Sequence, residues 1–339
     1  MKRRRNLYVF TACVLVFLYY FCGVSDYVFS RDFDSEFDYP LNTDIRPIVV
    51  DILAGNKPTV TPINIYPYRF LSHSAKCNAV EKLDLFILVK SAINHFQHRK
   101  AIRQTFGQEN YLPGRIVKIL FFLGINDMKS QTQRMVEKEI DEYEDIIQID
   151  FHDNYYNNTV KTMMSFRWAY EHCSTADYYL FTDDDMYISV SNLLNYVSEQ
   201  PSTGLSTSFY ETERDRLLFG GYVFKSAPHR YITSKWRVSI DEYPWNRWPP
   251  YVTAGAYVIS NKAFKIMYIG SLYVKHFRFD DIYLGIVAKK VGIEPTHCPH
   301  FYFYKKKYSK EDYSEVIASH GYSDHSELVR VWNEQNRII

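Results

Sequence analysis

Apolar runs and amphipathic segments alternate along the middle of the chain. The apolar runs have the length and continuity of strands buried on both faces, and they lie at residues 83–89, 116–124, 145–151 and 178–181. The segments between them carry apolar residues at helical spacing, at residues 98–106, 125–140, 160–173 and 190–197. Buried strands that alternate with helices predict an α/β domain built on a Rossmann-like, mostly parallel sheet with helices on both faces.

The pattern becomes mixed after Gly220. Two further strand-like runs, at residues 221–224 and 254–260, precede a helix that begins at Asn261 and an amphipathic helix at residues 280–292. We find no internal repeat. The simplest interpretation is a single domain over residues 77–339.

The N-terminus combines a basic cluster with an uncharged apolar run. Residues 2–5 (KRRR) precede the run at residues 7–24, and roughly 18 residues of helix span about 27 Å. A basic flank keeps its own side of the membrane cytoplasmic. We therefore predict a cytoplasmic tail (1–6), an uncleaved transmembrane signal anchor (7–24) and an irregular stem (25–76), with the domain in the secretory lumen. A cleaved signal peptide is the alternative, but the run is long for one and no small-residue cleavage site follows it.

The overall charge is close to neutral, with 40 Lys and Arg against 39 Asp and Glu. No basic run occurs beyond the N-terminus, which argues against a nucleic-acid partner. The 30 tyrosines and 23 phenylalanines fit either a large aromatic core or a site that stacks rings on sugars.

Three of the five cysteines would lie in the lumen. Cys77, Cys173 and Cys298 are expected to pair there, and an odd number leaves one thiol free or paired between chains. Cys13 and Cys22 lie in the apolar run. Asn157 opens the sequence Asn-Asn-Thr, which predicts a glycosylation site if this loop is luminal.

Three adjacent carboxylates, Asp183, Asp184 and Asp185, follow the strand at residues 178–181. Ligands bind beyond the carboxyl ends of strands in an open parallel sheet. Residues i and i+2 of an extended segment face the same way, so Asp183 and Asp185 could converge on a divalent cation. Hard oxygen ligands suit Mg²⁺ or Mn²⁺. The alternative is that these acids cap the next helix or face water.

A second acidic pair, Asp280 and Asp281, opens the helix at residues 280–292. Acids at this position also serve as ordinary partners of the helix dipole. A nucleotide-sugar transferase, however, needs both features: a metal that neutralises the departing diphosphate and a carboxylate that accepts the proton of the acceptor hydroxyl.

Seven motifs occur in a fixed order over most of residues 83–332. They are RKAIRQTFG (99–107), FFLG (121–124), DFHDNYYNNTVKT (150–162), FTDDDMYI (181–188), YPWNRWPPYVTAGAYVIS (243–260), FDDIYLG (279–285) and VIASHGYSDHSELVRVW (316–332). The set resembles the β-1,3-galactosyltransferase / β-1,3-N-acetylglucosaminyltransferase family, glycosyltransferase family 31. The resemblance implies a Golgi type II membrane enzyme with a GT-A fold that uses a UDP-sugar donor and Mn²⁺ or Mg²⁺.

The resemblance also implies roles for individual residues. Asp281 is expected to be the general base, and the family's inverting chemistry would give a β-linkage. Asp185 would be the principal metal ligand. The metal set then comprises Asp185, Asp183 and His320; the donor-binding set comprises Arg99, Arg103, Lys161, Asp183 and Asp184; the acceptor-binding set comprises Trp236, Tyr243, Tyr251 and Asp280.

Several positions depart from the family pattern. Phe106 replaces a tryptophan, Asp280 replaces a glutamate, and Val252 and Val287 stand where many members have cysteines. Cys77 and Cys173 then remain as the expected disulfide, and Cys298 has no assigned partner.

The leading hypothesis is a metal-dependent β-1,3-galactosyltransferase that uses UDP-galactose. N-acetylglucosamine is the alternative donor sugar. A catalytically inactive luminal chaperone and a paired-carboxylate hydrolase are the alternatives from other classes. The sequence leaves open whether the acceptor glycan is on a protein or a lipid, and whether the enzyme is a homo-oligomer.

Overall fold

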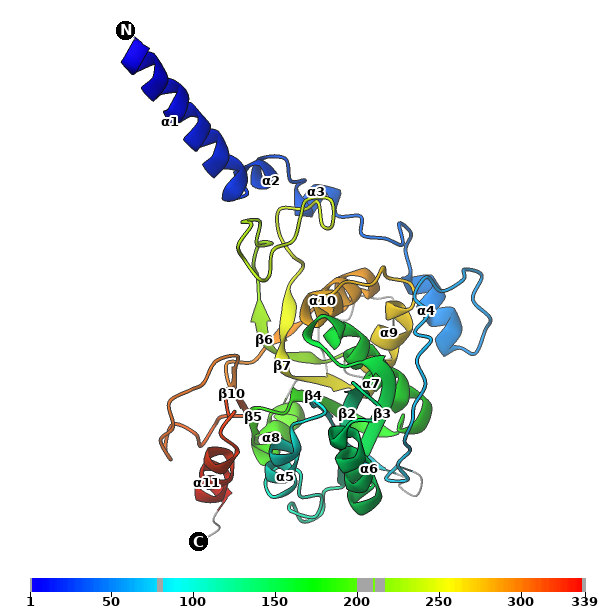
Figure 1. Ribbon diagram of the computed structural model, residues 1–339. Coiled ribbons are helices and arrows are strands. Elements are labelled where there is room, and N and C mark those ends of the chain that lie inside the picture. The colour runs from blue at the N-terminus through cyan, green and yellow to red at the C-terminus, as the bar shows by residue number, and fades with distance from the viewer. Residues whose placement is uncertain (1, 78–81, 200–209, 211–216, 337–339) are drawn as a thin grey trace.

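The computed structural model describes residues 2–77, 82–199, 210 and 217–336 (Figure 1). Its main sheet has seven strands in the order β3-β2-β1-β4-β7-β6-β8. The strands are β1 (Leu83–Lys90), β2 (Val117–Ile125), β3 (Ile146–His152), β4 (Ala176–Asp183), β6 (Phe219–Phe224), β7 (Tyr251–Ser260) and β8 (Thr296–His297). Only β7 runs antiparallel to its neighbours, β4 and β6. The predicted mostly parallel α/β sheet is therefore confirmed.

Helices cover both faces of this sheet, as the continuous apolar strands require. Along β1, Leu85, Ile87 and Val89 face one apolar cluster, and Phe86 and Leu88 face the other. The first cluster contains residues of α5 (Phe96–Arg103), α6 (Gln131–Tyr143), α8 (Val190–Glu199) and α11 (His325–Asn336). The second contains residues of α4 (Arg46–Leu53), α7 (Asn158–His172), α9 (Asn261–Ser271) and α10 (Asp280–Val291).

A smaller sheet lies beside the acidic strand end. It has the order β5-β10-β9, from β5 (Met186–Ile188), β9 (Phe301–Tyr302) and β10 (Ala318–His320). Because β10 pairs antiparallel with β5, His320 lies opposite Met186. The C-terminal part of the chain is thus brought to the strand end that carries Asp183 to Asp185.

The local sequence explains where α10 begins and ends. Asp280 and Asp281 occupy its first turn, where negative charge is favourable, and Lys289 and Lys290 occupy its last turn. Gly292 then ends the helix in a left-handed conformation. The helix-dipole interpretation of the acidic pair is therefore correct for its local structure, and a further role depends on what surrounds it.

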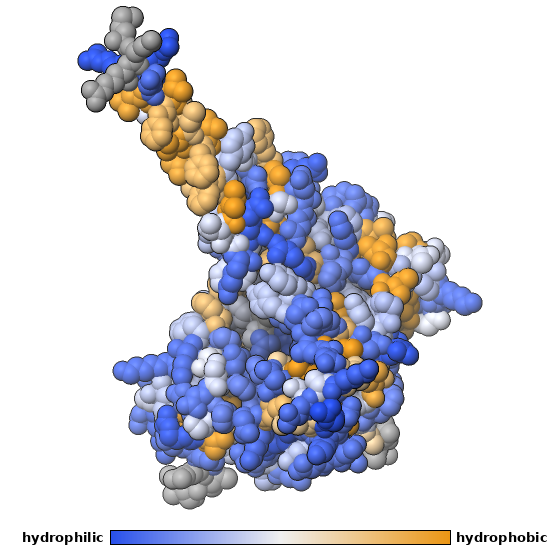
Figure 2. Space-filling view, in the orientation of Figure 1, coloured by the Kyte–Doolittle hydropathy of each residue, from blue (hydrophilic) through white to orange (hydrophobic). Residues whose placement is uncertain are grey.

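The N-terminal helix α1 (Lys2–Phe21) projects from the body of the protein, and its apolar surface is exposed (Figures 1 and 2). It includes the basic residues and ends before Val24, so its bounds differ from the predicted segment at 7–24. Among the described helices, none has both the length and the apolar composition needed to cross a membrane.

Part of the segment predicted as an irregular stem (25–76) forms helices and packs against the domain. It contains α2 (Val24–Val28), α3 (Phe33–Glu36) and α4. Tyr39, Ile45 and Val49 are buried in the cluster that also holds α9 and α10. The aromatic and aliphatic residues of this stretch are the cause, because they provide apolar surface that is stabilised by burial.

The predicted disulfide between Cys77 and Cys173 is confirmed. It joins the chain just before β1 to the end of α7. Cys298 is buried and free, and Cys13 and Cys22 are exposed and free.

Candidate functional site

Charged side chains converge where β1 and β4 end next to each other. Lys90, the last residue of β1, pairs in register with Asp183, the last residue of β4. The first turn of α10 brings Asp280 to the same edge, and α7 contributes Lys161 and Thr162. The topology thus places the three acids at residues 183–185 and the pair Asp280 and Asp281 at one site.

Lys90 connects the two acidic groups through Asp183 and Asp280. Its Nζ lies 2.6 Å from Asp280 Oδ2 and 3.1 Å from Asp183 Oδ1, and its side chain is almost fully buried. The two carboxylates raise the pKa of Lys90, although burial opposes this. Sequence reasoning missed this residue. The available signal was a single charge at the end of an otherwise apolar strand.

Asp280 remains ionised despite its burial. Burial alone would raise its pKa, but the Lys90 ammonium and a hydrogen bond from Thr162 Oγ1 at 2.8 Å hold the pKa below its usual value. Both contacts occupy Oδ2. Asp280 was predicted to bind the acceptor. Its contacts give it a role within the protein as well, as a fixed negative charge beside Asp281.

Asp281 is half-buried and has a strongly shifted pKa. Burial and the adjacent Asp280 carboxylate raise the pKa of Asp281 to about 7. A carboxyl group with this pKa can exchange a proton near neutral pH, which is the property that a general base needs.

The pKa of Asp183 is raised as well, to about 6. Burial is the main cause, and the Asp280 and Asp185 carboxylates contribute, whereas the Lys90 charge lowers it.

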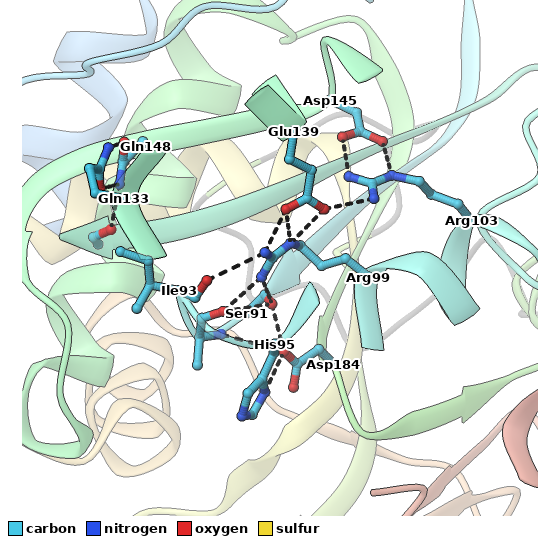
Figure 3. Close-up of polar contacts among 12 residues, drawn as sticks. Ser91, Ile93, His95, Arg99, Arg103, Gln133, Glu139, Asp145, Gln148 and Asp184 are labelled. Carbon is cyan, nitrogen blue, oxygen red and sulfur yellow. Dashed lines mark hydrogen bonds and ion pairs between the residues drawn. The ribbon is translucent and has the colours of Figure 1, made fainter. Parts of the chain in front are cut away.

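Asp184 is bound to the loop that follows β1. Ser91 Oγ donates to Asp184 Oδ2 at 2.6 Å, and His95 Nδ1 lies 2.9 Å from the same oxygen (Figure 3). Burial would raise the pKa of Asp184, but these two partners lower it. Asp184 in turn raises the pKa of His95. The negative charge of Asp184 is therefore stabilised inside the loop.

Arg99 lies behind this loop, and it lines neither of the two cavities described below. Its guanidinium donates to Ser91 Oγ at 3.0 Å and to the Ala92 carbonyl at 2.7 Å, and it pairs with Glu139 at 2.6 Å (Figure 3). It is fully buried. Direct donor binding by Arg99 is therefore not supported. Its contacts position the loop instead.

Arg103 is also used inside the protein. It pairs with Glu139 at 2.7 Å and with Asp145 at 2.8 Å (Figure 3). Its guanidinium also lies over the Tyr143 ring. None of these three partners lines either cavity at the ends of β1 and β4. The expectation that Arg103 contacts the donor is thus corrected, because burial requires a charged group to find internal partners.

Glu139→Ala is expected to lower the free energy of unfolding by about 3 kcal/mol, since it leaves the buried Arg99 charge without its main partner. Lys138→Ala, one residue away on the exposed surface of α6, is the control and should change it by less than about 0.5 kcal/mol. Urea unfolding measures both. Equal stability of the two variants would contradict the structural role of this ion pair.

Asp185 and His320 approach each other beside Asp183. His320 Nε2 lies 3.2 Å from Asp185 Oδ2, and both side chains are partly exposed. The Asp185 carboxylate raises the pKa of His320. Asp183, the third member of the predicted metal set, pairs with Lys90 rather than with His320. Consistent with this, the described residues contain no group of three or more His, Cys, Asp or Glu side chains arranged for a metal.

Two adjoining cavities meet at this edge. One, of about 420 Å³, is lined by the loop after β1, Lys161, Asp184, Asp185 and His320. Lys161 Nζ pairs there with Asp153 at 2.8 Å and donates to the Ser91 carbonyl. The other, of about 500 Å³, is lined by Asp281 and several aromatic side chains. Both cavities share four lining residues: Lys90, Tyr155, Asn158 and Asp183.

Two of the three predicted acceptor aromatics line the larger cavity. Trp236 is exposed and donates from its ring nitrogen to Tyr155 Oη at 3.3 Å. Tyr251 lines the cavity and its hydroxyl contacts Ser226. Tyr243 is fully buried and packs on Trp248, so its predicted role in acceptor contact is wrong.

Asn157 is partly exposed, at the start of α7. Its side-chain amide donates to the His152 carbonyl at 2.8 Å, and Thr159 of the same motif is fully buried. Glycosylation at Asn157 stays a prediction.

Comparison with known proteins shows similarity to sugar transferases. The family model described as Galactosyltransferase matches residues 97–299. The chain is 38% identical to "Beta-1,3-galactosyltransferase brn" of Drosophila melanogaster, over 94% of this chain and 93% of that protein. It is 35% identical to "Beta-1,3-galactosyltransferase 1" of Mus musculus, over 81% of each. It is 31% identical to "Lactosylceramide 1,3-N-acetyl-beta-D-glucosaminyltransferase" of Rattus norvegicus, over 98% of this chain and 86% of that protein.

Solved structures give more distant matches. A galactosyltransferase, LgtC, determined with donor and acceptor sugar analogs, aligns with a TM-score of 0.37 at 12% identity, over 75% of this chain and 97% of that one.

Proposed function

Because the chain belongs to the galactosyltransferase family and is a hexosyltransferase, we propose that it transfers galactose from UDP-galactose to an acceptor glycan in β-1,3 linkage. One observation carries the proposal. Asp281, with a pKa raised to about 7, faces a cavity that adjoins a second, carboxylate-lined one. The larger cavity, lined by Asp281 and aromatic side chains, fits an acceptor sugar. The smaller cavity, lined by Asp184, Asp185 and His320, fits a nucleotide donor.

The acceptor hydroxyl donates its proton to Asp281 as the oxygen attacks C1 of the donor sugar. The new glycosidic bond forms while the bond from C1 to the diphosphate oxygen breaks, and UDP leaves with that electron pair. Attack from the face opposite the leaving group inverts an α-linked donor to a β-linked product. Burial and the fixed charge of Asp280 keep the proton affinity of Asp281 high enough for this transfer.

Asp185 and His320 fit a divalent cation such as Mn²⁺ or Mg²⁺. One carboxylate and one imidazole lie 3.2 Å apart and both line the smaller cavity. Sites of this kind complete their coordination with substrate phosphates. Bound there, the ion would neutralise charge on the departing diphosphate. Asp183 is expected to help hold the donor through its position between the cavities.

N-acetylglucosamine is the second candidate donor sugar. The relative from Rattus norvegicus, which the chain matches over 98% of its length, is named for transfer of this sugar. The inactive-chaperone and hydrolase hypotheses lack a comparable observation.

We also propose a Golgi location with the domain in the lumen and α1 as the membrane anchor. The basic cluster ahead of the apolar run supports the orientation. The Cys77–Cys173 disulfide supports an oxidising compartment.

An assay of UDP release tests the proposal. The full chain is given UDP-galactose or UDP-N-acetylglucosamine, a panel of glycan acceptors, and either Mn²⁺ or a chelator. We expect acceptor-dependent release with one donor and loss of release with chelator. Folded protein that binds UDP but releases none with any acceptor would contradict the transferase, and chelator-insensitive turnover would contradict the metal.

A further inference from the structure

A short segment near the N-terminus, residues 31–37, lies beside the loop that precedes β7 (Figure 1). We call this segment the strap. It contains α3 and belongs to the stretch predicted as a stem (25–76). Phe33 of the strap and Asn246 of the loop are 213 positions apart in the chain, so only the fold brings the two segments together.

Backbone hydrogen bonds join the strap to this loop. Arg31 N donates to the Pro244 carbonyl at 2.8 Å, and Asn246 N donates to the Arg31 carbonyl at 2.9 Å. Arg31 and Trp245 thus form a parallel β-bridge. One residue of the strap therefore binds the backbone polar groups on both sides of Trp245.

Side chains add three further hydrogen bonds. Asn246 Oδ1 accepts from Phe33 N at 3.0 Å, and Asn246 Nδ2 donates to Asp32 Oδ1 at 3.3 Å. The indole Nε1 of Trp245 donates to the Glu36 carbonyl at 2.7 Å. Each of these bonds crosses from the strap to the loop, so together they fix the position of one relative to the other.

Trp248 follows the strap-bound residues directly. Arg247, the residue before it, pairs with Asp34 of the strap. Pro249 and Pro250 come after it, and each proline ring fixes its own φ on the way into β7. Trp248 is therefore held between residues that the strap binds and a conformationally restricted dipeptide.

The strap also borders a third cavity, of about 450 Å³, which Phe33 and Asp34 help to line. Three lining residues are common to this cavity and the larger one: Ser226, Ala227 and Trp248. The Trp248 ring also contacts Tyr243 and Phe277, at centroid distances of 4.0 and 5.4 Å. A cavity supplies no packing atoms. Where Trp248 borders the two cavities, its position therefore depends on the backbone that carries it.

We infer that the strap positions Trp248 in the larger cavity and thereby determines the affinity for the acceptor sugar. The inference deepens the transferase function proposed above and rests on it. Trp248 lines the cavity that contains Asp281, and aromatic side chains are the usual lining of small-ligand sites. Loss of strap contacts lowers the fraction of molecules with Trp248 in place, and the apparent acceptor affinity falls with that fraction. No strap residue lines the smaller cavity, so donor affinity should not change.

Asn246→Ala in the full chain tests the inference. Asn246 is exposed and lines none of the three cavities, and the substitution removes two of its hydrogen bonds to the strap. UDP release is measured while the methyl glycoside of an active acceptor from the panel described above is titrated. We expect the KM for this acceptor to rise about fivefold, with kcat and the KM for the UDP-sugar unchanged.

Asn56→Ala is the matched control. Asn56 is an exposed asparagine of the same N-terminal stretch, and it lies outside the strap. All three kinetic constants should stay as in the unmodified chain. Trp245→Phe is a milder variant, because it keeps an aromatic ring but removes the hydrogen bond to the Glu36 carbonyl. It should raise the acceptor KM in the same direction, by about twofold.

A double variant tests whether the strap acts through Trp248. Trp248→Phe keeps an aromatic ring of smaller size and should itself raise the acceptor KM. Residues that act through one group are not additive. Asn246→Ala combined with Trp248→Phe should therefore raise the acceptor KM by clearly less than the product of the two single effects.

Three results would overturn the inference while leaving the transferase intact. The first is an unchanged acceptor KM in Asn246→Ala. The second is a lower kcat with both KM values unchanged, which would show that the strap only maintains the folded fraction. The third is a double variant whose effect equals the product of the single effects. Absence of transfer by the unmodified chain with every acceptor would instead contradict the transferase itself.

Discussion

Asp281→Asn is expected to abolish sugar transfer while UDP-sugar binding is retained. The amide cannot accept the proton of the acceptor hydroxyl, and a positioned base contributes about 10²–10⁴-fold to such a step. Asn has nearly the same shape as Asp, so the fold around Lys90 and Asp280 should persist. Product formation measures the first effect, and calorimetric titration with UDP-sugar measures the second.

The pH dependence of the unmodified enzyme provides a second readout of the same residue. A base must be unprotonated, and the pKa of Asp281 is raised to about 7. Activity should therefore rise with pH through about 7 and fall roughly tenfold per unit below it. Asp141→Asn, at an exposed position on α6, is the control and should leave the profile unchanged. Near-normal turnover of Asp281→Asn, or a flat profile between about pH 6 and 8, would remove Asp281 as the base.

Asp185→Ala is expected to lose metal-dependent binding of the UDP-sugar and to reduce transfer by at least about 100-fold. The variant would keep one of the two protein ligands proposed for the cation, whose stabilisation of diphosphate charge amounts to several kcal/mol. Donor titration with Mn²⁺ and with chelator measures the effect. Binding by the variant should be weak and unchanged by chelator.

The fold should tolerate this substitution. Asp185 and His320 are partly exposed, and ion pairs of this kind stabilise proteins by about 1 kcal/mol or less. His320→Ala should weaken metal-dependent binding in the same direction, and the double variant should add little, because both residues act through one ion. Tight, Mn²⁺-dependent donor binding by Asp185→Ala would contradict its role as a ligand.

The local pattern of the chain predicts much of the fold and part of the site. Continuous apolar runs identified β1 to β4, and the acids at residues 183–185 were correctly placed at the end of a strand. The Cys77–Cys173 pair was anticipated through the family resemblance. These features depend on periodicity, strand ends and ordered motifs, all of which can be read from neighbouring positions.

Long-range partners could not be read in this way. Arg99 and Arg103 look like solvent-exposed or ligand-binding cations in sequence, but they are paired with Glu139 and Asp145. Tyr243 looks like a surface aromatic residue of a sugar site, but it is buried against Trp248. The packing of the predicted stem was missed for the same reason.

The sequence by itself determined the alternation of strands and helices, the acidic strand end and the acidic first turn of α10, because each follows from the spacing of nearby side chains. Only the tertiary structure decided that Lys90 lies between Asp183 and Asp280. Only the tertiary structure also buries Asp281, which with the adjacent Asp280 carboxylate raises its pKa to about 7. Burial is the larger cause of that pKa, and the opposing charge of Lys90 comes from a residue distant in the chain. Both depend on which elements pack together, and the local pattern does not contain that information.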